Sequence, residues 1–380
     1  MWYLFSAFLR TGGLMNSRER FVRALTGGGI DRVPFMVVFG GEGAVAPEWE
    51  AKEPGLSKKI DGILKFEGPY RGWQDTWVNT FLVGEPDPVV VEENDDRKII
   101  RTGCGGLKLV SKHGDFHSAV LEAPVKSRKD WENIRDRFLD PNDERRFPGN
   151  WKEQCAQYNK RDYALGLNLQ GVYNTARMLM GDEGLSYAFY DEPALVSEIM
   201  DTVTDRVMKI FGKMCGDVEQ FDLIESWEAM AFNGGSMVSP DTFRQFIKPN
   251  YEKLAGFAKG HNIKILLGDS HGFIEDLAAL FLESGFTAMY PFEAQAGNNV
   301  ERVMDKYPQL GIIGGLDKNA MAKGRKAVDA EIAKARRLLK RRGRYIPGQD
   351  YFPLGDISFE NYRYFMEELR KAVLESERQR

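Results

Sequence analysis

Residues 264–293 begin with Lys264-Ile265-Leu266-Leu267-Gly268-Asp269-Ser270-His271-Gly272 and end at Glu293. The apolar runs 264–267 and 288–292 are typical of short buried strands, and the segment 273–284 between them has the apolar pattern of a helix. A strand, a helix and a second strand in this order predict two parallel strands joined by a right-handed crossover. The stretch therefore predicts one repeat of an α/β fold.

The same alternation extends in both directions from this repeat. Further strands are predicted at 33–39, 164–169, 221–225, 311–314 and 345–347. Further helices are predicted at 240–259, 298–306, 318–342 and 358–375. The count predicts a closed (β/α)8 TIM barrel. An open doubly wound sheet is the alternative, although no G-x-G-x-x-G opens any of these helices, which disfavours its dinucleotide-binding form.

One part of the chain interrupts the alternation. Short β-like runs separated by glycines fill residues 86–125 and predict an antiparallel insertion in the N-terminal third. No flexible linker flanks it, so we interpret residues 15–380 as one barrel domain that includes the insertion. Residues 1–14 form an N-terminal extension, which packs on the barrel or precedes a true start at Met15. Its apolar run lacks the preceding basic residue and the cleavage site of a signal peptide.

Composition excludes several classes of protein. The net charge of −4 disfavours nucleic-acid binding, which normally uses a basic surface. No run reaches the roughly 18 apolar residues that span a bilayer. The three cysteines Cys104, Cys155 and Cys215 are widely spaced and form no C-x-x-C pair. They favour a reducing compartment, and we expect a cytoplasmic enzyme.

Carboxylates recur where the predicted strands end. The residues are Glu225, Glu228, Asp269, Glu293, Asp317 and Asp350. The carboxyl ends of barrel strands form the active site in enzymes of this fold, so these side chains are candidate functional residues. Asp317 is better explained as a cap of the following helix.

Asp269 and His271 stand out because one residue separates them and both can face one pocket. They suit a base with its orienting carboxylate, or, together with Asp350, a metal site. The aromatic residues Trp73 and Trp77, with Phe81 four residues further on, predict a packed helical face, with a pocket wall as the alternative.

Several motifs together resemble the uroporphyrinogen decarboxylase superfamily, which also contains corrinoid-dependent methyltransferases. They are Ser17-Arg18-Glu19-Arg20-Phe21, Asp31-Arg32-Val33-Pro34, Trp227-Glu228-Ala229-Met230-Ala231, Gly268-Asp269-Ser270-His271-Gly272, Ile313-Gly314-Gly315-Leu316-Asp317-Lys318 and Tyr345-Ile346-Pro347. They extend across nearly the whole chain. The resemblance implies a (β/α)8 barrel.

Departures from the superfamily's motifs distinguish its branches. The decarboxylases bear an arginine-rich loop after the first strand, whereas Phe39-Gly40-Gly41-Glu42-Gly43 has no arginine and one acid. A substrate with several carboxylates would be repelled there. Thiol-methylating members bind zinc through His-x-Cys and a later cysteine. The matching positions here are Asp269, His271 and Asp350-Tyr351, so zinc remains possible and a metal-free acid/base site is equally compatible.

The resemblance implies a methyltransferase that moves a methyl group between a small substrate, such as a methoxylated compound, and a corrinoid on a partner protein. In that interpretation His271 and Asp269 carry the acid chemistry, and Glu225 and Glu228 orient the substrate. The expected substrate contacts are Glu293, Tyr351, Trp227 and Phe39. A decarboxylase or other lyase acting on a small substrate, and a non-catalytic binding barrel, are the alternatives. A homodimer is left open.

Overall fold

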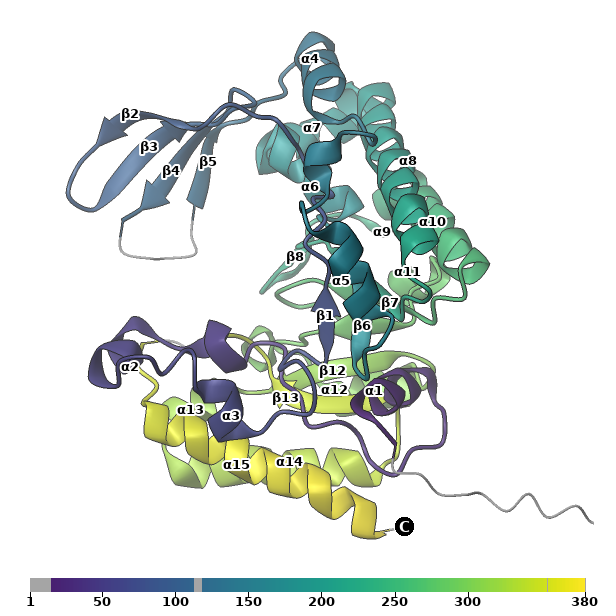
Figure 1. Cartoon of the computed structure of the whole chain (residues 1–380). Helices are drawn as coiled ribbons and strands as arrows, with labels where there is room; N and C mark the ends of the chain where they lie inside the picture. The colour runs from purple at the N-terminus through teal and green to yellow at the C-terminus, as the bar shows by residue number, and fades with distance from the viewer. Residues whose placement is uncertain (1–14, 113–117, 354, 380) are drawn as a thin grey trace, which may run out of the picture.

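The computed structural model describes residues 15–112, 118–353 and 355–379; the 1–14 extension lies outside the described residues. It is a mixed α/β fold around a seven-stranded, all-parallel sheet (Figure 1) with the order β1-β6-β7-β10-β11-β12-β13. The strands are β1 (Trp73–Asp75), β6 (Ala164–Leu169), β7 (Leu223–Trp227), β10 (Ile265–Asp269), β11 (Ala288–Tyr290), β12 (Gly311–Leu316) and β13 (Tyr345–Gln349). The alternation of strands and helices predicted from residue 164 onward is confirmed.

The sheet curls as a half-barrel, and its edges β1 and β13 are not joined by a ladder in the described part of the chain. The prediction of a strand at 33–39 is wrong: the segment is buried, but it does not pair with a strand of the sheet. It passes beside β13, because a Cβ added to Gly348 would lie 3.9 Å from Val37 Cα. Val37 donates its N–H to the Tyr70 carbonyl at 2.7 Å. Pro34 has no N–H, which prevents regular pairing at the start of the segment.

Helices cover the outer face of the sheet. The longer ones are α1 (Ser17–Thr26), α4 (Arg128–Phe138), α5 (Trp151–Tyr158), α6 (Val172–Met180), α7 (Asp182–Asp191), α8 (Pro193–Asp217), α10 (Lys248–Gly260), α11 (Leu277–Glu283), α12 (Val300–Lys306), α14 (Arg325–Lys340) and α15 (Phe359–Glu375). The shorter ones are α2 (Pro47–Lys52), α3 (Ile60–Leu64), α9 (Pro240–Thr242) and α13 (Asn319–Ala322). None of the described helices is long and apolar enough to cross a membrane.

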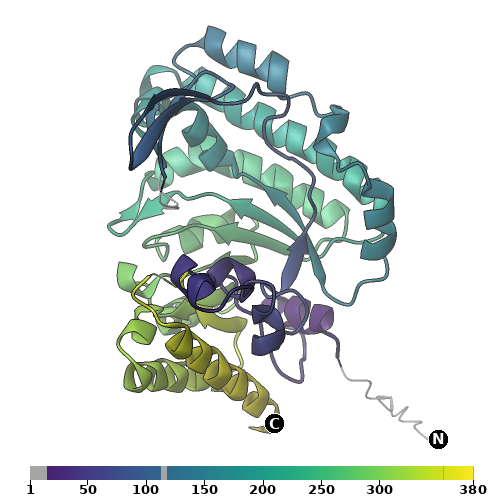
Figure 2. The same cartoon turned by 60° about the vertical axis from the view of Figure 1, so that its left-hand side comes forward.

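The antiparallel insertion is confirmed. It is a four-stranded sheet of β2 (Val89–Glu93), β3 (Arg97–Arg101), β4 (Leu107–Ser111) and β5 (Ser118–Glu122), paired in chain order. Figures 1 and 2 show it projecting from the helical layer rather than joining the parallel sheet. Ser127 then caps α4 by accepting the Asp130 N–H.

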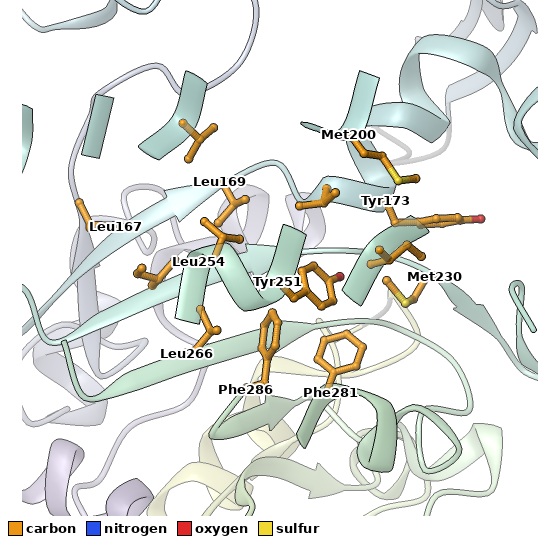
Figure 3. Packing of buried hydrophobic residues seen from close by; sticks show 14 of the residues in the cluster. Leu167, Leu169, Tyr173, Met200, Met230, Tyr251, Leu254, Leu266, Phe281 and Phe286 are labelled. Carbon is orange, nitrogen blue, oxygen red and sulfur yellow. The ribbon is translucent and has the colours of Figure 1, made fainter. Parts of the chain in front are cut away.

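Alternation along each strand divides the core into two clusters. Leu266 of β10 packs outward with Tyr251, Phe281 and Phe286 beneath the helices (Figure 3). The Tyr251 and Phe286 rings meet edge to face with centroids 4.7 Å apart. The neighbouring residues Ile265 and Leu267 face the other cluster, inside the curl of the sheet. Because successive side chains of a strand point to opposite faces, each short strand contributes to both clusters.

The helical face predicted from Trp73, Trp77 and Phe81 is wrong. Trp73 lies in β1 and is buried, whereas Trp77 is 76% exposed and no helix forms there. Two buried arginines bind the backbone of this segment: Arg206 donates to the Thr80 carbonyl at 2.7 Å and Arg146 to the Phe81 carbonyl at 2.6 Å. Carbonyls bound in this way cannot enter a helical ladder, so tertiary contacts override the local spacing.

Gly171, immediately before α6, provides a test of this architecture. Its backbone has φ 84° and ψ 152°, a conformation open almost only to glycine, and an added Cβ would lie 2.2 Å from the Trp227 carbonyl oxygen. We expect Gly171→Ala to lower the free energy of unfolding by about 2 kcal/mol or more. Gly212→Ala is the matched control, since no described atom lies within 4 Å of a Cβ there and it sits inside α8. It should raise stability by about 0.5–1 kcal/mol. Equal denaturation midpoints for the two variants would contradict the α6 geometry.

Candidate active site

Polar side chains converge at the carboxyl ends of neighbouring strands, the edge that we call the barrel mouth. In the register of the sheet Asp269 lies opposite Trp227 on β7 and opposite Tyr290 on β11. Parallel strands bring their carboxyl ends to one edge, so residues from distant parts of the chain meet there.

Glu225 of β7 is the most heavily bonded of these groups. It is almost completely buried and accepts hydrogen bonds from Arg71 Nη2 at 2.8 Å, from Asn168 Nδ2 at 3.1 Å and from the Tyr290 hydroxyl. Arg71 also contacts Asp75 Oδ2 at 2.9 Å, and its guanidinium lies 4.6 Å from the centre of the Trp73 ring. Glu225, predicted to orient the substrate, therefore already accepts hydrogen bonds from three side chains of the protein.

Asp269 lies beside this network. The Tyr290 hydroxyl is 3.0 Å from Asp269 Oδ2, while Asp269 Oδ1 has no hydrogen-bond partner among the described residues. Oδ1 faces His271 Nε2 at 3.8 Å. Burial raises the pKa of the Asp269 carboxyl to about 6, with Glu225 adding to the rise and His271 opposing it. A carboxylate in this state can hold or release a proton near neutral pH.

His271 stands between two carboxylates. Its Nδ1 lies 3.1 Å from Glu293 Oε1, which also accepts the Gly272 N–H at 3.1 Å. Burial lowers the pKa of His271, but the hydrogen bond with Glu293 and the charges of Asp269 and Glu293 outweigh it, so the pKa lies above the ordinary 6.5. Contact with His271 and the Gly272 N–H lowers the pKa of Glu293 despite its burial. The predicted pairing of His271 with Asp269 is present in space, with Glu293 on the other side of the ring.

Aromatic rings border the imidazole. The Tyr351 ring meets it edge-on at a centroid distance of 5.0 Å, and the Phe39 ring lies 6.1 Å away. Lys318 Nζ lies 4.4 Å from the centre of the Tyr351 ring. The structure thus gathers three of the four predicted substrate contacts, Glu293, Tyr351 and Phe39, around His271. The fourth, Trp227, ends β7 and is 42% exposed.

Glu228, predicted to orient the substrate, has a different place. It is fully buried, and its carboxylate accepts the N–H groups of Val172 and Tyr173 at 3.0 Å each and the Ser226 hydroxyl at 2.5 Å. Those two N–H groups open α6, and Gly171 before them has no side chain to cap the helix. Glu228 therefore caps α6 from another element, as favoured by the positive end of the helix dipole. We correct its predicted role to a structural one.

Asp350, predicted as a metal ligand, also binds backbone groups. Its carboxylate accepts the N–H of Ala294 at 2.7 Å and that of Lys318 at 3.1 Å, so it ties together two loops at the mouth. Burial raises its pKa to about 6. In residues 15–112, 118–353 and 355–379 no cluster of three or more His, Cys, Asp or Glu side chains is placed to hold a metal ion. The predicted metal set of Asp269, His271 and Asp350 is therefore not assembled.

Sequence reasoning missed Arg71, Asp75 and Tyr290. Arg71 precedes β1 and Asp75 is its last residue, and a strand of only three residues gives no apolar run. Burial, with the charge of Glu225, raises the pKa of Asp75 to about 7. Tyr290 lies in a run that we interpreted as apolar. A hydroxyl at the end of a strand predicted to border the site was the available signal.

The comparisons with known proteins support the fold. No protein-family model and no curated protein matches the sequence. Among solved structures, a methyltransferase from Methanosarcina mazei matches 95% of this chain and 99% of its own, with 17% identity and a TM-score of 0.60. A putative vitamin-B12-independent methionine synthase from Listeria monocytogenes matches 57% of this chain and 64% of its own, with 10% identity and a TM-score of 0.31. The first likeness shows that the overall fold is shared.

The raised pKa of His271 makes a prediction about stability. A raised folded-state pKa means that the imidazolium contributes stability that is fully present below pH 6.5 and is lost as the pH rises through the folded-state pKa. We expect the difference in unfolding free energy between the wild type and His271→Gln to be larger at about pH 6 than at about pH 9. Urea denaturation at both pH values measures it. A difference that grows with pH would show that the imidazole is held neutral.

Proposed function

We propose that the protein is a methyltransferase of the uroporphyrinogen decarboxylase type, and that it removes a methyl group from a small substrate such as a methoxylated compound. The observation that carries the proposal is the position of His271, between the carboxylates of Asp269 and Glu293 at the mouth. The fold shared with a methyltransferase and the sequence motifs support the same class.

The residues of this chain supply acid chemistry for such a transfer. Breaking a methyl ether bond leaves the electron pair on oxygen, and that oxygen needs a proton as it departs. The contacts that raise the pKa of His271 favour its protonated form more than in an ordinary histidine, and the imidazolium can donate that proton. Asp269 and Glu293 stabilise the imidazolium, and Phe39 and Tyr351 form apolar walls beside it. After donation, the flanking carboxylates favour reprotonation of the imidazole.

A corrinoid on a partner protein would supply the nucleophile that accepts the methyl group. Three large apolar side chains near the end of β7 suit contact with such a partner, since Trp227 is 42%, Phe232 58% and Met237 36% exposed. Phe232 belongs to the small hairpin of β8 (Ala231–Phe232) and β9 (Gly235–Ser236). Asp350, one member of the predicted zinc set, accepts hydrogen bonds from two backbone N–H groups.

The lyase alternative is disfavoured by charge. A decarboxylase must hold a substrate carboxylate, which arginine side chains do best. Arg71 is the guanidinium bound into this network, and it contacts both Glu225 and Asp75. An incoming carboxylate would therefore meet a guanidinium that two acids of the protein already bind.

Replacing the acid tests the proposal. We expect His271→Ala to lower the rate of methyl transfer by at least roughly 100-fold, because the leaving oxygen loses its proton donor. The assay follows the absorbance of a reduced corrinoid in the presence of methoxylated donors. The control is His261→Ala, since His261 lies in an exposed position after α10 and should leave the rate unchanged. Full activity of the His271 variant would remove the assignment.

A further inference from the structure

The mouth has more hydrogen-bond acceptors than donors. Asp269 is 8% exposed, and its Oδ1 faces the His271 ring without a hydrogen-bond partner among the described residues. The Tyr290 hydroxyl reaches both Asp269 and Glu225, yet it has one proton and donates to one of them at a time. Buried acceptors without donors destabilise a protein, so a bound ligand that supplies donors would be favoured.

A second acceptor lies at the end of β13, which β11 and β12 separate from β10. Gln349 is 1% exposed and donates its amide nitrogen to the Phe39 carbonyl at 2.6 Å. That carbonyl accepts only, so the orientation of the amide is fixed and Oε1 points elsewhere. In the described part of the chain Gln349 Oε1 has no partner. Gln349 is connected to the mouth through Phe39, whose ring packs beside His271.

The mouth also has more carboxyl groups than cationic groups. The carboxylates of the mouth are Asp75, Glu225, Asp269 and Glu293. The facing cations are Arg71, His271 when protonated, and Lys318. These four carboxyl groups outnumber the three cationic groups, and the raised pKa values of Asp75 (about 7) and Asp269 (about 6) mean that a bound cation would favour their ionised forms. Such a region attracts cations and repels anions.

Aromatic faces complete the environment. The Phe39 and Tyr351 rings lie 5.3 Å apart and both border His271. Lys318 Nζ over the Tyr351 ring shows that this ring already accepts a positively charged nitrogen at one position. Aromatic faces beside carboxylates are a favourable setting for ammonium groups.

From these three observations we propose that the substrate of this site carries an ammonium group with at least one N–H. The nitrogen supplies a missing donor to Asp269, and its charge stabilises the ionised form of that carboxyl. The inference rests on the proposed function only in placing the substrate at this mouth, and it narrows the substrate to an amine-bearing methylated compound. A neutral methoxylated compound would bring no charge to offset the carboxylates.

A matched pair of probes tests the charge directly. 2-Methoxyethylammonium and 2-methoxyethanol both carry a methoxy group and differ in the ammonium. Isothermal titration calorimetry with the full-length protein should show the ammonium binding at least about tenfold more tightly than the alcohol. Equal or tighter binding of the alcohol would overturn the proposal. A titration with Mg²⁺ or Zn²⁺ alone is the other arm, and tight metal binding that excludes the ammonium probe would also overturn it.

Two variants assign the effect to the mouth. Asp269→Asn removes the charge of the unpartnered oxygen and should reduce the ratio of ammonium to alcohol binding constants by at least about fivefold. Glu293→Gln repeats the test should the first variant fold poorly, as judged by circular dichroism. Asp191→Asn, an exposed change of the same charge at the end of α7, should leave the preference intact. If Asp191→Asn lost as much of the preference for the ammonium probe, the preference would arise from the net charge of the protein, and the assignment to the mouth would be overturned.

Binding and transfer can fail separately. Tight binding of the ammonium probe without methyl transfer to a corrinoid would refute the proposed function and keep the site as a cation-binding one. Methyl transfer from neutral donors alone, with no preference for the ammonium probe, would keep the function and refute this inference.

Discussion

A single buried carboxylate, Glu225, connects the strand ends on which the rest of the site depends. It receives hydrogen bonds from Arg71 before β1, from Asn168 on β6 and from Tyr290 on β11, so one side chain joins three other segments of the sheet. Removing one partner of a buried ion pair typically costs about 3–5 kcal/mol, because the other charge is left without compensation. The Arg71–Glu225 pair therefore fixes the geometry of the mouth before any ligand arrives.

The position of that pair shapes the electrostatics of its neighbours. Arg71 is hydrogen-bonded to both Glu225 and Asp75, and the next two acids of the mouth, Asp269 and Glu293, have the His271 ring between them. Burial then raises the pKa of Asp269, and the carboxylates on either side of His271 raise the pKa of the imidazole. One arrangement would explain both the proposed proton donor and the proposed preference for a positively charged substrate. Glu228 and Asp350 hold the surrounding backbone in place and leave the chemistry to this group.

The sequence predicted those parts of the fold that depend on local pattern. The strand at 164–169 and the antiparallel insertion are found as expected, because alternation and glycine punctuation reflect burial and turns directly. Residues 33–39 are apolar and were predicted to form a strand. They run beside β13 without pairing with it as a strand, and Pro34 has no N–H to donate to such a pairing. At the site, proximity in sequence identified Asp269 and His271. Arg71 and Glu228 depend on contacts across 154 residues and about 55 residues, and no local pattern reports such pairs.

Measuring the protonation state of His271 tests most directly whether this residue is an acid held between two carboxylates. Imidazole ¹⁵N chemical shifts of His271, assigned by comparison with a variant that lacks it, report whether one or both ring nitrogens carry protons. We predict a doubly protonated ring at pH 6.5, the ordinary pKa of histidine, and a titration midpoint above that value that falls in Glu293→Gln. A ring that is neutral at pH 6.5, or a midpoint indifferent to Glu293, would contradict an acid held between two carboxylates.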